Sequence, residues 1–220
     1  MNIFNNLLSV PAFWNLVQNV LGATSFKREL YLSRLHPPGK LLDFGCANGH
    51  IADAFLDFDY HGVDIDPIAI NAAKRRFREK PNMHFVEADI RSRPFGPDYF
   101  DEVLFATTIH HLDDETLSAV LKELHYCLKP DGTIHVFDLV RQDHDGWSQK
   151  LMRTLDQGKY TRTLTGIVSL IERAGLFDIG KPSLHKPYGA LLQDCDVAYL
   201  PLRKRIPGTC DRFPRAANVV

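Results

Sequence analysis

Short apolar runs alternate along the chain with stretches in which apolar residues recur at helical spacing. The apolar runs predict five strands, at Lys40–Phe44, His61–Asp64, Met83–Glu87, Phe100–Ala106 and Thr133–Leu139. The stretches between and after them predict helices at His50–Phe58, Pro67–Arg78, Asp113–Leu128 and Gly166–Ala174, and two more strands at Phe177–Pro187 and Asp196–Leu202. Strands that alternate with helices of this length form parallel βαβ units. The pattern therefore predicts an α/β fold with a doubly wound sheet.

The first 26 residues carry no charged side chain. Their apolar positions predict a helix over Phe13–Thr24, and a second helix is expected over Lys27–Leu35, before Pro37-Pro38-Gly39. The first of these helices is interpreted as a lid over a ligand, as a helix packed on the sheet, or as a membrane-surface contact. The predicted organisation is an N-terminal helical cap or lid at 1–38, a main domain at 39–203 and a basic tail at 204–220.

Charge and composition narrow the class of protein. Lys and Arg total 26 against 27 for Asp and Glu, so no net field attracts nucleic acid. Polar residues interrupt the N-terminal apolar run, which favours neither a signal peptide nor stable membrane insertion. The four cysteines, Cys46, Cys127, Cys195 and Cys210, are widely spaced, which is typical of reduced thiols in a cytoplasmic protein.

A glycine-punctuated turn follows the first strand. Gly45, Ala47 and Gly49 come directly after Asp43, and the next strand ends at Asp64. In a parallel sheet the carboxyl ends of strands meet at one edge, where glycines let main-chain N–H groups approach a ligand and an acid accepts ribose hydroxyls. A dinucleotide fingerprint requires glycine where this chain has Ala47 and His50, so a nicotinamide oxidoreductase is the weaker interpretation. Asp43 at the strand end favours an ammonium group over a pyrophosphate.

Four motifs in order resemble those of the S-adenosylmethionine-dependent methyltransferases of the seven-stranded Rossmann-like class. They are Asp43–Gly49, Val63–Pro67, Val86–Ile90 and Phe100–Leu112, with Leu128–Gly132 ahead of the fifth strand. The resemblance implies a mostly parallel seven-stranded sheet with an antiparallel closing strand, and S-adenosyl-L-methionine as cofactor. It places ribose on Asp64, the adenine amino group on Asp89 and the cofactor ammonium on the carbonyls of Gly45 and Ala106. The full set of expected cofactor-binding residues is Asp43, Gly45, Cys46, Ala47, Gly49, Asp64, Ile65, Asp89, Ile90 and Ala106.

Methyl transfer needs alignment of the acceptor behind an already activated methyl, and a base only where the acceptor must lose a proton. His110 and His111 follow the fourth strand and are the candidate bases, with packing and helix-start roles as the alternative. Adjacent residues at a helix start are expected to point apart, so we predict no metal site there. The segment 141–165 is the candidate acceptor pocket, or else a solvated connection. Its candidate residues are His144, Trp147, Arg153, Lys159, Tyr160 and Arg162, with His185 and Tyr188 as weaker candidates.

The sequence therefore predicts an S-adenosylmethionine-dependent methyltransferase with a small-molecule acceptor. In the resembling class an Asn/Asp-Pro-Pro-Tyr sequence marks methylation of base or amide nitrogens, and its absence here favours O- or C-methylation and disfavours nucleic acid. The alternative is a cofactor-binding regulatory or partner subunit without transferase activity of its own. The oligomeric state and the identity of the acceptor stay open.

Overall fold

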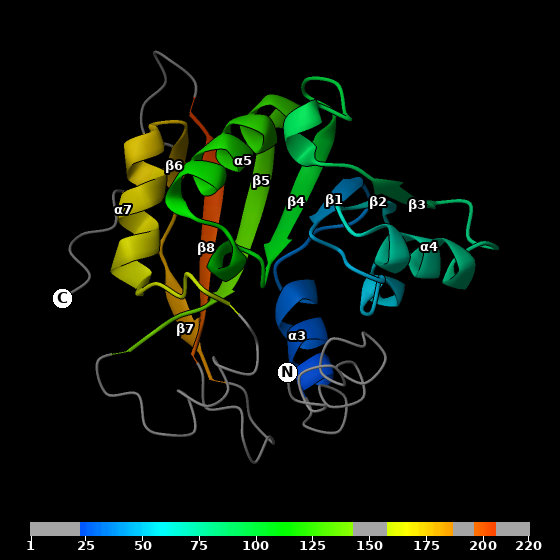
Figure 1. Ribbon diagram of the computed structural model, residues 1–220, viewed down its shortest axis with the longest axis horizontal. Helices are drawn as coiled ribbons and strands as arrows, with labels where there is room; N and C mark the ends of the chain where they lie inside the picture. Colours follow the sequence, from blue (N-terminus) through cyan, green and yellow to red (C-terminus); the bar gives the residue numbers. More distant parts are fainter. Residues whose placement is uncertain (1–22, 143–157, 187–195, 206–220) are drawn as a thin grey trace, which may run out of the picture.

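The computed structural model describes residues 23–142, 158–186 and 196–205 (Figure 1). These residues form one eight-stranded sheet in the order β3-β2-β1-β4-β5-β8-β6, with β7 also paired to β8. The strands are β1 Lys40–Phe44, β2 Asp59–Asp64, β3 Met83–Glu87, β4 Phe100–Ala106, β5 Leu128–Leu139, β6 Phe177–Ile179, β7 Ser183–His185 and β8 Val197–Lys204. The prediction of an α/β fold with a mostly parallel sheet is confirmed.

The strand order reverses between β1 and β4. The chain builds β1, β2 and β3 outward on one side, then crosses to β4 and β5 on the other, and all of these neighbours are parallel. In open α/β sheets ligands bind at such a switch point, beyond the carboxyl ends of the strands. β8 runs antiparallel between β5 and β6, as the predicted closing strand does.

The predicted strand at 177–187 is two short strands. β6 pairs with the end of β8 and β7 pairs with its beginning, and the chain leaves the ladder between them at Gly180–Pro182. Proline has no N–H to donate to a ladder, which explains an interruption at this point. The Gly180 N–H still donates to the Pro201 carbonyl at 2.8 Å, so the break remains attached to β8. This interruption raises the strand count from seven to eight.

The helices are α3 Ala23–Leu32, α4 Pro67–Arg76, α5 Asp114–Cys127 and α7 Leu164–Ala174, with 3-10 turns at η1 Ala52–Phe55, η2 Ile90–Ser92 and η3 Ile109–His111. Side chains of Asp66, Asp113 and Thr163 cap the starts of α4, α5 and α7 by accepting main-chain N–H groups. Pro67 occupies the first position of α4, as predicted, where no N–H is required.

The predicted helix over His50–Phe58 forms only the single 3-10 turn η1. Ile51 stands at its N-terminal cap position and offers no side-chain acceptor. The Arg76 guanidinium donates to the carbonyls of Gly49 and His50 at 3.1 and 3.3 Å, and these carbonyls would otherwise begin a helical ladder. The helix predicted at Lys27–Leu35 begins and ends earlier in the chain, because α3 runs from Ala23 to Leu32. The predicted helix over Phe13–Thr24 lies almost entirely outside the described residues.

Two apolar cores cover the two faces of the sheet. One lies under α5 and α7 and includes Leu42 and Phe105, whereas the other lies under α3, η1 and α4 and includes Leu41 and Leu104. Neighbouring residues of one strand thus enter opposite cores, as a sheet covered on both faces requires. α3 lies close to the carboxyl end of β4 in Figure 1.

The ends of the predicted main domain are only partly described. The closing strand extends to Lys204, and Arg205 donates to Asp178 at 2.9 Å, so the first residues of the predicted tail belong to the sheet. The boundaries at 1–38 and 204–220 otherwise stay a prediction. Among the residues described, none of the helices combines the length and apolar character needed to cross a bilayer.

Candidate functional site

The turn after β1 has a backbone that favours glycine at three positions. Gly45, Ala47 and Gly49 have φ values of +78°, +47° and +65°. A Cβ on Gly45 would lie 2.6 Å from the Oγ1 of Thr108, so the turn and the end of β4 approach more closely than a side chain allows. The N–H groups of Gly45 and Cys46 both donate to the Val63 carbonyl, at 2.9 and 3.2 Å. The turn is therefore fixed to the end of β2.

Asp64 joins this turn to the tip of β2. One carboxylate oxygen accepts the Ala47 N–H at 2.8 Å, and the other accepts the Asp66 N–H at 2.9 Å. Each oxygen has a further lone-pair site for a ligand hydroxyl. The next residue, Ile65, is 73% exposed, as is Ile68. An acid beside uncovered apolar side chains suits a nucleoside, which has hydroxyl groups on the ribose and an apolar base face.

Asp89 follows β3 and is held by its own neighbour. Its carboxylate accepts the Arg91 N–H at 2.9 Å and the Arg91 guanidinium at 2.6 to 3.0 Å, and this side-chain bond holds the pKa of Asp89 below its usual value. The pair is exposed and screened by solvent, so Arg91 can move aside at little cost. Ile90 is buried, and the N–H of Ala88 donates to the Asp64 carbonyl at 3.0 Å. The ends of β2 and β3 therefore bring the two predicted acids to one edge.

Asp43 lies below the turn and not on its surface. Only 6% of the residue is exposed, and its carboxylate accepts the Tyr60 hydroxyl at 2.6 Å. Burial raises the pKa of Asp43 to about 7. Cys46 is buried beside it, and burial raises the pKa of its thiol, which excludes a thiolate at neutral pH. Both residues shape the turn from beneath.

The end of β4 turns sharply at Ala106. The Ala106 carbonyl accepts the Thr108 hydroxyl at 2.8 Å and keeps a second lone pair for another donor. Thr107 has a φ of +49° and donates its N–H to the Phe137 carbonyl at 2.7 Å. Because Thr108 packs against Gly45, the carbonyl predicted to hold an ammonium group lies beside the glycine turn.

His110 and His111 occupy different environments. His110 is 2% exposed, its Nδ1 pairs with the buried carboxylate of Asp138, and its N–H donates to the other Asp138 oxygen at 2.9 Å. Gly158 lies directly on the His110 ring, where a Cβ would come within 2.3 Å. His111 is exposed. The prediction that the two rings point apart is wrong, because their centroids lie 4.2 Å apart in η3.

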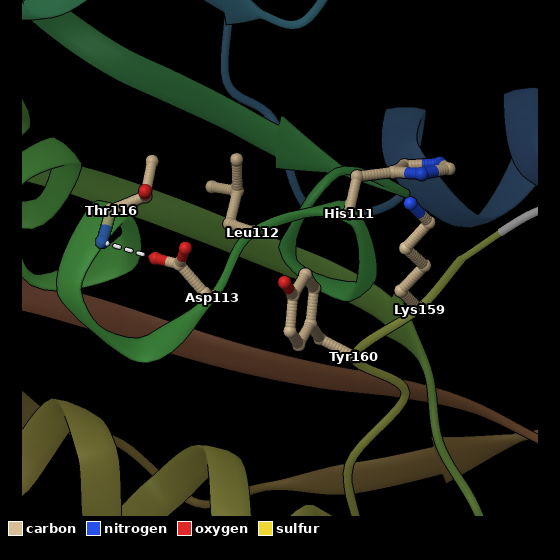
Figure 2. Close-up of a pocket in the computed structure, with 6 residues that line it drawn as sticks. All are labelled: His111, Leu112, Asp113, Thr116, Lys159 and Tyr160. Carbon is tan, nitrogen blue, oxygen red and sulfur yellow. Dashed lines mark hydrogen bonds between the residues drawn. The ribbon is translucent and has the colours of Figure 1, made fainter.

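A pocket of about 330 Å³ lies beside η3 (Figure 2). Its size falls within the range of small-molecule sites. It is lined by His111, Leu112, Asp113, Thr116, Lys159 and Tyr160. Three of the expected chemical groups thus meet here, an imidazole, an ammonium and a phenol.

Arg162 is the functional residue whose role the sequence did not indicate. Its guanidinium donates to the carbonyls of Ile109 and Leu112 at 3.2 and 2.8 Å and to the Asp114 carboxylate at 2.5 Å. Its side chain is only 12% exposed. Together with the bond from the Tyr160 N–H to the His110 carbonyl at 2.9 Å, this fixes η3 to the segment before α7. Arg162 therefore holds the pocket wall, and it is not among the residues that line the pocket.

Of the other acceptor candidates, the structure describes only His185. His185 in β7 bonds to the Ser183 hydroxyl at 2.9 Å, away from the pocket-lining set. His144, Trp147, Arg153 and Tyr188 lie outside the described residues.

Comparison with known proteins assigns the fold to a class. Residues 41–132 match the family described as Methyltransferase domain, which spans the glycine turn, all three acids and η3. The chain superposes on the Haemonchus contortus phosphoethanolamine N-methyltransferase 2 in complex with S-adenosyl-L-methionine with a TM-score of 0.70 at 16% identity, over 94% of this chain and 61% of that one. Residues 41–132 are thus similar to a methyltransferase domain, and the fold is the Rossmann-like fold of the S-adenosylmethionine-dependent methyltransferases. S-adenosylmethionine is the cofactor of this class.

Curated relatives match with moderate identity. The phosphoethanolamine N-methyltransferase of Plasmodium falciparum is 26% identical over 144 residues, which are 64% of this chain and 54% of that protein. The mitochondrial arginine-hydroxylase NDUFAF5 of Homo sapiens is 36% identical over 123 residues, 56% of this chain and 34% of that protein. The chain thus spans about a third to a half of the length of these relatives.

Proposed function

We propose that this protein transfers a methyl group from S-adenosylmethionine to a small-molecule acceptor that binds beside η3. One observation supports the proposal most strongly. The glycine turn, Asp64, Asp89 and Ala106 lie at the carboxyl ends of four neighbouring strands, β1, β2, β3 and β4, where the strand order reverses, and the pocket with His111 opens next to the end of β4.

Three groups of the cofactor have a proposed counterpart at this edge. We assign the ribose hydroxyls to Asp64 and the adenine to Asp89, Ile90 and the exposed Ile65. The ammonium group is assigned to the carbonyls of Gly45 and Ala106. Asp43, Cys46, Ala47 and Gly49 support the turn, because their side chains or backbone angles set its shape and none needs to touch the ligand.

The two histidines receive separate roles. His111 lines the pocket and is the candidate base for an acceptor that loses a proton. His110 is buried against Asp138 and Gly158, so we assign it to positioning of η3. A phenol or an anionic group on the acceptor would meet Lys159 and Tyr160.

The atom that receives the methyl group is proposed to be oxygen or carbon. The support is the absence of an Asn/Asp-Pro-Pro-Tyr sequence after β4, where this chain has Ala106-Thr-Thr-Ile109. The P. falciparum relative is named as an N-methyltransferase, which makes an amine nitrogen the acceptor to test against this preference. Nucleic acid is not a proposed partner, since the net charge is −1. The cytoplasmic location stays a prediction from the spacing of the cysteines.

Cofactor binding is tested by titration calorimetry with S-adenosylhomocysteine on the full chain. We expect Asp64→Asn to bind at least tenfold more weakly, because each ribose hydrogen bond to a charged group contributes roughly 1.5–3 kcal/mol. Asp131→Asn, an exposed acid at the start of β5, is the matched control and is expected to bind like the wild type. Equal affinity in both variants, at unchanged thermal stability, would exclude the assigned ribose site.

Transferase activity is tested separately with methyl-labelled S-adenosylmethionine and a cell extract. Label in the small-molecule fraction supports the proposal, and label only in nucleic acid or protein contradicts it. A chain that binds cofactor and labels nothing would favour the second candidate, a cofactor-binding subunit without transferase activity. The human relative is named as a hydroxylase and not as a methyltransferase, so a match to this domain is compatible with a protein that transfers no methyl group. His111→Ala should lower turnover and leave cofactor affinity unchanged.

A further inference from the structure

A cluster of three metal-ligating side chains lies on the sheet away from the nucleoside edge. Asp59 begins β2, His61 follows it on the same strand, and His84 is the register partner of His61 on β3. The Nε2 atoms of His61 and His84 lie 3.2 and 3.1 Å from the same Oδ1 of Asp59. Asp64 ends the strand that Asp59 begins, so the cluster and the predicted ribose acid occupy opposite ends of β2.

The nearest alternative is a carboxylate that accepts hydrogen bonds from both rings, but the geometry at His61 does not fit it. The Nε2 of His61 is buried, and its 3.2 Å contact with Oδ1 of Asp59 does not have the geometry of a regular hydrogen bond. His61 as a whole is 9% exposed. A buried nitrogen with a poorly aligned contact keeps part of the cost of its desolvation. A bound cation would use the lone pair of this nitrogen and remove that cost.

The spacing matches the dimensions of a zinc site. Zinc–nitrogen and zinc–oxygen bonds of about 2.0–2.2 Å in a tetrahedron place neighbouring ligand atoms about 3.3–3.5 Å apart. The two Nε2–Oδ1 distances are close to that edge length, and all three ligand atoms lie within 4.8 Å of one another. The two imidazole rings stack with centroids 4.7 Å apart and an interplanar angle of 29°, so the exposed His84 side chain must rotate to direct both Nε2 atoms at one ion, with water at the fourth corner.

The surroundings fix two of the ligands and leave one accessible. The Lys40 ammonium donates to Oδ2 of Asp59 at 2.5 Å, which leaves Oδ1 facing the histidines. The His61 ring packs edge-on against the rings of Tyr99 and Phe100, which sets its orientation. The His84 side chain is 45% exposed and offers an entry path from solvent. The positive charge of Lys40 opposes a cation, so we expect micromolar and not nanomolar affinity.

We propose that Asp59, His61 and His84 bind a divalent transition-metal ion of the zinc type. Two imidazoles and one carboxylate favour zinc, copper or nickel over magnesium and calcium, which prefer all-oxygen sites. The ion would join β2 to β3 toward the end of these strands opposite the cofactor edge. The site is independent of the proposed methyl transfer and stands or fails without it.

Zinc titration of the full chain, followed by calorimetry and by thermal unfolding, tests the proposal. We expect one zinc ion to bind and raise the unfolding temperature, and magnesium to have no such effect. His84→Ala removes an exposed ligand with little risk to folding and should weaken zinc binding at least tenfold. His36→Ala, whose side chain is 79% exposed and lies outside the cluster, is the matched control and should bind zinc like the wild type.

Cobalt substitution identifies the ligand atoms. A tetrahedral nitrogen–oxygen site gives visible absorption without a thiolate charge-transfer band, whereas binding through a cysteine gives that band. The proposal is overturned by wild-type zinc affinity in His84→Ala, by equal losses in His84→Ala and His36→Ala, or by a thiolate band in the cobalt protein. Absence of zinc binding by the wild-type chain overturns it as well.

Discussion

Replacement of Asp43 by asparagine should remove part of the pH dependence of the free energy of unfolding. The Asp43 carboxyl is almost fully buried, and burial raises its pKa from 3.8 to about 7, with a smaller contribution from the charge of Asp64. The Tyr60 hydroxyl opposes this by donating to the ionised form. An acid with a raised native pKa stabilises the fold most at low pH, where it is protonated in both states. That contribution declines as the pH rises from about 4 to about 7.

The size of the effect follows from the two pKa values. A difference from 3.8 to about 7 corresponds to about 4 kcal/mol at 1.36 kcal/mol per unit. Between pH 5 and pH 8 the part of this that changes is roughly 3 kcal/mol. Asp43→Asn cannot ionise, so its free energy of unfolding relative to that of the wild type should rise by roughly 3 kcal/mol over this interval. The amide group introduced by Asp43→Asn has buried N–H groups of its own. They change the difference in free energy of unfolding between the variant and the wild type by the same amount at every pH, so the dependence of this difference on pH is unaffected.

Urea unfolding at several pH values between 5 and 8 measures this difference. Asp131→Asn, an exposed acid, provides the control and should follow the wild type within about 0.5 kcal/mol. A difference between Asp43→Asn and the wild type that stays constant over the interval would show that Asp43 is ionised in the fold without a raised pKa. The account of a buried acid beneath the glycine turn would then be wrong.

Three other substitutions test the turn and the pocket wall. Gly45→Ala should cost about 2 kcal/mol in urea unfolding, because its φ is +78° and the new Cβ meets Thr108; a neutral result would contradict the close approach. Ala47→Gly should stabilise by up to about 1 kcal/mol in the same assay, since it relieves a positive φ, and a loss would show that the alanine methyl contributes packing. Arg162→Ala should cost roughly 2–4 kcal/mol, because three main-chain carbonyls, of Ile109, Leu112 and Tyr160, and a carboxylate lose their donor. Arg173, whose side chain is 70% exposed, is the control, and Arg173→Ala should cost no more than about 0.5 kcal/mol. Equal losses of stability in the two arginine variants would show that the Arg162 hydrogen bonds do not hold the pocket wall.

Local sequence patterns were sufficient to predict most strands and the acids at their ends. β1, β3 and β4 begin and end at the predicted residues, because a buried strand bounded by turn residues is a local signal. Asp64 and Asp89 reach one edge because the carboxyl ends of parallel strands meet there, which topology alone requires. The interrupted strand at 177–187 was missed, although Gly180 and Pro182 indicate such a break.

Contacts between distant residues could not be predicted in the same way. The His110–Asp138 pair spans 28 positions, and the Arg162–Ile109 bond spans 53. His84 meets His61 only because β2 and β3 pair in one particular register. A shift of one residue would send these side chains to opposite faces, so no single-strand pattern indicates the cluster.

Arg162 holds the pocket wall through main-chain atoms and not through the side chains that line the pocket. Its bonds to residues 109 and 112 run to main-chain carbonyls, which every amino acid possesses, and none runs to His111, Thr116 or Lys159. Side chains at these three positions can therefore be exchanged while the wall keeps its shape. A small library at 111, 116 and 159, with Arg162 retained, is a practical starting point for redirecting the domain to new acceptors.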